Sequence, residues 1–122
     1  MKIIEAINRI DSLKHNTYTQ GEKLIWLSEV DWDVVKNIIA THEGDTPTFN
    51  GYDDSTDLQT ELLIPAPYDK AYLLWMEAQI HYYNGEYDKH NNAMDMFYEA
   101  FESFERHYNR THMPKGKKFK FF

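Results

Sequence analysis

The sequence predicts an all-α protein: a small helical bundle of four to five helices, with a long 43–66 loop and an extended C-terminal tail. Three observations support this class. Apolar residues recur at helical spacing along most of the chain, candidate caps separate these stretches, and turn-forming residues concentrate in 43–66. A chain of 122 residues and 14.6 kDa has room for one domain. We place a helical domain at 1–112 and a basic aromatic tail at 113–122.

The first helix is predicted over 2–14, where five apolar residues follow the i, i+3, i+4, i+7 pattern of one helix face. These residues are Ile3, Ile4, Ile7, Ile10 and Leu13.

The next helical stretch covers 20–42 and allows two interpretations. Thr19 and Glu22 have the spacing of a capping box, so a helix begins there. Asp31 is suited to cap a third helix after a bend at Val30, because a carboxylate accepts hydrogen bonds from the first free amides. The alternative is one continuous helix over 20–42.

Two further helices are predicted over 68–83 and 86–109, joined as an antiparallel hairpin by Asn84 and Gly85. The helix over 68–83 is apolar around most of its circumference and is therefore expected to be central. The second carries a seam of large side chains at heptad spacing, which we expect to be core. The seam comprises Tyr87, Met94, Phe97, Phe101, Phe104 and Tyr108.

The composition argues against an enzyme or a metalloprotein. Cysteine is absent, which excludes disulfides, thiolate metal sites and a cysteine nucleophile. No serine has a Gly-x-Ser-x-Gly context and there is no glycine-rich phosphate loop. Glu77 and His81 are one turn apart, but no Glu-x-x-His pair accompanies them, so we expect no metal site and no cofactor.

Hydrophobic patterning predicts neither a signal peptide nor a membrane span, so we expect a protein made and kept in a cytoplasm, with no membrane partner. More large apolar residues are present than short helices bury. We expect four of them to face another subunit. They are Ile64, Tyr68, Tyr82 and Tyr83.

Charge is unevenly distributed along the chain. Residues 1–105 carry all 20 acidic residues and seven of the 13 basic ones, a net charge of −13, whereas 106–122 carry six basic residues and no acidic one. Three interpretations of the tail remain: contact with nucleic acid, a disordered terminus, or an alternating Lys/Phe strand that pairs with a partner's sheet edge. Because the acidic body repels DNA, we favour a protein partner.

Several short blocks, in order, resemble small prophage proteins of low-GC Gram-positive hosts. These are NTYT at 16–19, KLIWLSEVD at 23–31, LIPAPYD at 63–69, YYNGE at 82–86, NN at 91–92 and YNRTHMP at 108–114. His90 stands where that family usually has Tyr. Those proteins are similar to the head–tail connector (adaptor) proteins of long-tailed phages.

The resemblance implies an α-helical virion protein that assembles into a ring, usually twelvefold, at the head–tail junction after synthesis in the host cytoplasm. The implied partners are the portal protein, a tail-side connector or tail terminator, other copies of itself, and DNA that passes without specific binding. The alternative is a small phage regulatory or DNA-binding protein.

By position, the 43–66 loop with its flank and the tail are the candidate docking segments. The candidate partner-binding residues are Leu63, Ile64, Pro65, Pro67, Tyr68, Lys115, Lys117, Lys118, Phe119, Lys120, Phe121 and Phe122.

Overall fold

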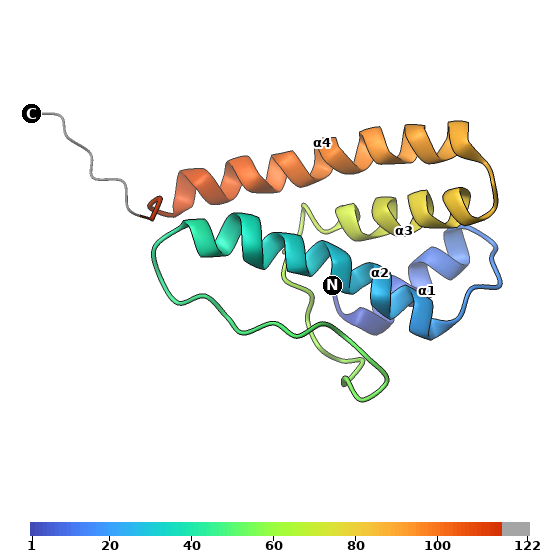
Figure 1. Ribbon diagram of the computed structural model, residues 1–122, viewed down its shortest axis with the longest axis horizontal. Coiled ribbons are helices and arrows are strands. Elements are labelled where there is room, and N and C mark those ends of the chain that lie inside the picture. Colours follow the sequence, from blue (N-terminus) through green and yellow to red (C-terminus); the bar gives the residue numbers. More distant parts are fainter. Residues whose placement is uncertain (116–122) are drawn as a thin grey trace, which may run out of the picture.

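The computed structural model describes residues 1–115 and confirms the all-α class. Its four α-helices are α1 (Ile3–Leu13), α2 (Gln20–Asp33), α3 (Lys70–Tyr83) and α4 (Tyr87–Thr111), and Figure 1 shows α3 and α4 as an antiparallel hairpin above α1 and α2. Within 1–115 the backbone forms no strand, only two isolated bridges, one from Lys2 to Glu61 and one from His42 to Pro114.

The stretch after Thr19 is one continuous helical run, which confirms the second interpretation and excludes a bend at Val30 with Asp31 as a cap. The Thr19 side chain does accept a hydrogen bond from the Glu22 amide at 3.2 Å, which confirms where α2 begins. α2 then continues directly into a π-helical segment, η1 (Val34–Ile38), and a 3₁₀ turn, η2 (Ile39–Thr41). Asp31 lies inside α2, where every neighbouring amide already has a helical partner.

The core lies where α3 packs between α4 and the two N-terminal helices. Tyr72 and Met76 of α3 are fully buried, as expected for a central helix. The aromatic seam of α4 is confirmed at Phe97, Phe101 and Phe104, which are at most 8% exposed. Burial of each such side chain stabilises the fold by about 1.5–3 kcal/mol, so this seam holds the long α4 against the bundle.

The long connection from residue 43 to residue 69 packs against the helices. The amides of Ile3 and Ile4 donate to the carbonyls of Thr60 and Leu58, each at 3.0 Å, and the Leu62 amide donates to the Met1 carbonyl at 2.9 Å. These bonds satisfy amides that a helix N-terminus otherwise leaves free. The connection therefore completes the start of α1, and Figure 1 shows it running past α2 and α1.

The segment after α4 is bonded to the end of η2. The Glu43 amide donates to the Met113 carbonyl at 2.8 Å, and the Lys115 amide donates to the Thr41 carbonyl at 2.7 Å. The first residues of the predicted tail, 113–115, are thus held against the helical unit. The remaining candidate contacts of the tail lie outside the described residues: Lys117, Lys118, Phe119, Lys120, Phe121 and Phe122.

Candidate interaction surfaces

The apolar patch that precedes α3 divides between the core and the surface. Ile64 is fully buried, and its amide donates to the Tyr72 hydroxyl at 2.7 Å. Leu63 is half-buried, whereas Pro65 and Pro67 are exposed. Ile64, expected to face another subunit, therefore packs inside its own subunit and contributes nothing to the surface.

Pro67 and Tyr68 line a depression of about 350 Å³ between the start of α3 and the middle of α4. Met96 of α4 lies on its rim and is 55% exposed. The Tyr68 ring stacks on His107, with ring centres 5.1 Å apart. The exposed Pro67 and the half-buried Tyr68 thus lie against α4, close to the helix end from which the tail leaves.

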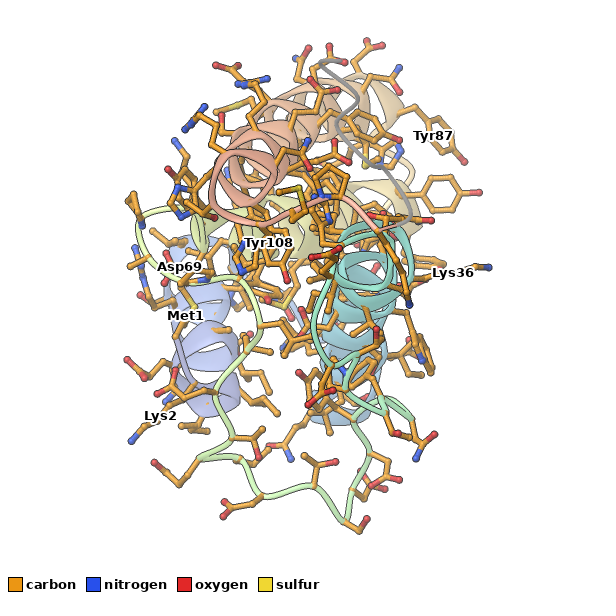
Figure 2. The ribbon with its side chains drawn as sticks, turned by 90° about the vertical axis from the view of Figure 1, so that its left-hand side faces the viewer. Met1, Lys2, Lys36, Asp69, Tyr87 and Tyr108 are labelled. Atoms are coloured by element: carbon orange, nitrogen blue, oxygen red, sulfur yellow. The ribbon has the colours of Figure 1, made fainter. Side chains whose placement is uncertain are left out.

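This end of α4 is built from stacked rings. His42 is buried, its Nδ1 lies 2.6 Å from the Ile38 carbonyl, and its ring meets the edge of Tyr108 at 4.8 Å. A carbonyl only accepts hydrogen bonds, so the His42 Nδ1 carries a proton. His112 stacks on the face of Tyr108 with ring centres 3.7 Å apart. Figure 2 looks onto this end of the molecule, where Met1 and Asp69 also lie side by side.

The opposite end, at the α3–α4 turn, exposes a second group of rings. Tyr82, Tyr83 and Tyr87 are 48%, 59% and 61% exposed. Tyr83 stacks over the buried Trp26 with ring centres 6.2 Å apart. Tyr82 and Tyr83 are therefore exposed, and their contact with another subunit stays a prediction. Tyr87, the first member of the predicted seam, is not core, because it begins α4 beyond the end of α3.

Asp31 forms a buried polar centre that the sequence analysis missed. The side chain is fully buried and accepts hydrogen bonds from the Tyr72 hydroxyl at 2.5 Å, the Leu63 amide at 3.3 Å and the Tyr52 hydroxyl. The Ser28 hydroxyl, one turn earlier on α2, accepts from the Tyr52 amide at 2.7 Å. α2 therefore holds both the long connection and α3 through polar contacts.

The electrostatics of this centre follow from its burial. Burial raises the pKa of Asp31, and hydrogen bonds from Tyr52, Tyr72 and the Leu63 amide partly oppose the shift. The pKa values of Tyr52 and Tyr72 are raised as well, first by burial and then by the Asp31 charge beside them. Both hydroxyls remain protonated donors across the physiological range. The donors and acceptors of this centre are already paired with one another, so its role is to anchor the long connection and α3 to α2.

Glu77 and His81 do not form a shared site. Glu77 pairs with Lys14 at 3.3 Å, and the His81 Nδ1 lies 3.1 Å from Glu86 Oε1. The contacts with His81 and then Lys89 lower the pKa of Glu86 to about 2. Residues 1–115 contain no group of three or more potential metal ligands.

Comparisons with family models, with curated proteins and with solved structures find no match for this chain. Among the helices of residues 1–115, none is both long enough and apolar enough to cross a membrane.

Proposed function

We propose that the protein is a head–tail connector subunit of a long-tailed phage or prophage, which forms a ring between portal and tail and extends the DNA channel. The proposal starts from the ordered sequence blocks that resemble this family. The observation in the structure that carries it is the position of the two candidate docking segments: Tyr68 stacks on His107 of the last turns of α4, and Lys115 is bonded to the adjoining end of η2.

The charge distribution supports a head-to-tail contact between neighbouring subunits. Residues 86–105 carry six acidic side chains and one basic one, whereas 106–115 carry three basic residues and no acidic one. A subunit whose two ends differ in sign has complementary surfaces for the next copy, and such heterologous contacts form a ring when the rotation between copies closes. The excess of acidic groups on the body also suits a channel wall, because it repels the phosphates of passing DNA.

The test is binding to rings of the portal protein that the same phage genome encodes. Tyr68→Ala should weaken co-sedimentation with portal rings, because Tyr68 lies at the proposed contact end. Tyr87→Ala, which removes an exposed ring at the opposite end, is the control. Circular dichroism should show both variants fully helical.

Two results would overturn the proposal. One is the absence of binding by the unaltered protein to portal rings. The other is tight binding to plain duplex DNA that falls steeply with salt, the behaviour of a protein that neutralises phosphates.

A further inference from the structure

The loop before α2 and the α3–α4 turn form a cleft of about 180 Å³ that the proposed portal contact does not use. Its lining residues are Tyr18 of that loop, Glu22 and Trp26 of α2, and Tyr83 at the end of α3. Most ligand pockets are larger, at about 300–1,000 Å³. The cleft is therefore suited to a single side chain rather than to a helix or a cofactor.

Three aromatic rings form most of this cleft and hold one another in place. The Tyr18 ring lies 5.6 Å from Trp26 with the planes at 66°, and 6.3 Å from Tyr83 with the planes at 56°. The Tyr18 hydroxyl donates to Asn84 Oδ1 at 2.6 Å, which ties this ring to the α3–α4 turn. Trp26 is 2% exposed and forms the base, whereas Tyr83 is 59% exposed. Because the faces of aromatic rings are electron-rich, such a group of rings attracts a cation.

Glu22 adds a negative charge to the cleft. Its carboxylate forms no ion pair among residues 1–115. Lys23, the next residue, is already bonded to Asp11 at 2.6 Å. The cation that complements the cleft must therefore come from elsewhere. A guanidinium group fits best, since its plane stacks on aromatic rings while its N–H groups bind a carboxylate.

Guanidinium groups of this kind lie at the other end of α4. Residues 106–115 contain Arg106, Arg110 and Lys115 and no acidic residue. Arg106 donates to the Ser103 hydroxyl at 3.2 Å. Arg110 is exposed, and in the described part of the chain it has no ion pair. Of these groups, the Arg110 guanidinium is thus the one best placed to enter a cleft on another molecule.

We propose that Arg110 of a second copy inserts into this cleft, where its guanidinium packs on Tyr18 and Tyr83 and pairs with Glu22. The two halves of the contact cannot meet within one subunit, because the α4 residues from Tyr87 to Arg110 span about 35 Å at 1.5 Å per residue. Figure 1 accordingly shows the α3–α4 turn and the C-terminal end of α4 at opposite ends of the long axis.

The contact repeats from copy to copy, because each subunit has one cleft and one Arg110. Such a head-to-tail contact forms a ring when the rotation between copies closes. The inference deepens the connector proposal by naming a contact between neighbouring subunits, and it rests on that proposal for the ring. The association itself is measured without portal protein.

Sedimentation velocity of the full-length chain at increasing protein concentration tests the contact. The unaltered protein should form dimers and larger species. Glu22→Gln combined with Tyr83→Ala disables the cleft, and Arg110→Gln disables the inserted group. Each change removes a cation–π contact and an ion pair, so each should raise the dissociation constant by about tenfold or more.

Two control variants match these changes. Tyr87→Ala removes a ring at the same end that is 61% exposed and does not line the cleft. Arg9→Gln removes an exposed arginine of α1. Both controls should associate like the unaltered protein, and circular dichroism should show all variants equally helical.

Mixing the two disabled variants is the sharpest measurement. Arg110 of the cleft variant can still enter the intact cleft of Arg110→Gln, so the mixture should form dimers and nothing larger. The inference is overturned if the unaltered protein stays monomeric or stops at dimers, if either disabled variant associates as tightly as the unaltered protein, or if the mixture stays monomeric.

Co-sedimentation with portal rings separates this inference from the connector function. Portal binding by a protein that does not self-associate through Arg110 would overturn the inference alone. Self-association through Arg110 without portal binding would support the inference and overturn the connector function.

Discussion

Replacing Tyr72 with Phe removes one hydroxyl group from the centre around Asp31 and leaves the aromatic ring in place. That hydroxyl donates to Asp31 at 2.5 Å and accepts from the Ile64 amide at 2.7 Å. The variant therefore weakens the solvation of a buried carboxylate and also leaves a buried amide without its acceptor. No volume is added, so the change reports on hydrogen bonding rather than on packing.

The magnitude follows from these two losses. A hydrogen bond to a charged group contributes about 1.5–3 kcal/mol, and an unsatisfied buried amide costs about 1–3 kcal/mol. Asp31 keeps its bonds from Tyr52 and the Leu63 amide, which limits the first loss. We expect Tyr72→Phe to lower the free energy of unfolding by about 2–4 kcal/mol.

Urea unfolding followed by circular dichroism measures this loss. The matched control is Tyr18→Phe, which removes a hydroxyl that donates to Asn84 at 2.6 Å at the exposed surface and should cost less than about 1 kcal/mol. The slope of unfolding free energy against urea should be the same for both variants. A loss below about 0.5 kcal/mol for Tyr72→Phe, or equal losses for the two variants, would refute the anchoring role of Asp31.

Three further predictions follow from the same contacts. Because the pKa of Asp31 is raised in the folded state, the folded protein binds the proton of this carboxyl group more tightly than the unfolded chain does. The contribution of Asp31 to the free energy of unfolding therefore falls as pH rises from about 3.8 through the folded pKa. Asp31→Asn should remove this pH dependence. Glu86 is the opposite case: its pKa is lowered from 4.5 to about 2, so its contribution is lost as pH falls through that window, and Glu86→Gln should flatten the acid side of the profile. Gly51→Ala should destabilise the fold by about 1–3 kcal/mol, because φ is +89° there and the added Cβ would lie 2.9 Å from the Trp32 ring; Gly44→Ala, at φ +110° with open space around it, should cost only the backbone strain of about 1 kcal/mol.

Periodicity was sufficient to predict the helices, because each buried face here is a long apolar stripe. α1 and α4 begin and end within two residues of their predicted bounds. Gly85 takes φ +78°, as the predicted left-handed cap between α3 and α4 requires. Local signals of this kind depend only on residues a few positions apart.

Asp31 shows where local signals leave two interpretations open. An aspartate after an apolar run favours a helix cap on propensity alone, but Asp31 also lies at helical spacing from Leu27, Val34 and Ile38, all of which are buried. The donors that make burial of this carboxylate tolerable, Tyr52 and Tyr72, are 21 and 41 residues away. In the sequence, the only signal for the burial of Asp31 was its helical spacing from buried residues. Its hydrogen-bond donors, Tyr52 and Tyr72, are brought to it only by the tertiary fold.

The candidate contacts divide for a similar reason. Hydrophobicity placed Ile64 on a partner surface, whereas the chain's own core takes it because its amide is bonded to Tyr72. Tyr68 is only half-buried, and its ring stacks on His107 of α4. To predict which of Ile64 and Tyr68 is buried, one must know which side of this segment α3 covers.

The two sides of α2 have different roles. Asp31 faces inward and anchors the long connection, whereas Glu29 and Asp33, two residues before and after it, flank a cleft of about 120 Å³. Residues two positions apart on a helix point to nearly opposite sides, because each residue turns the chain by about 100°. Substitutions at Asp31 should therefore lower the free energy of unfolding, because they remove the buried hydrogen-bond acceptor of Tyr52, Tyr72 and the Leu63 amide. Substitutions at Glu29 and Asp33 should leave the buried anchor intact, so the two sides of the helix can be altered separately.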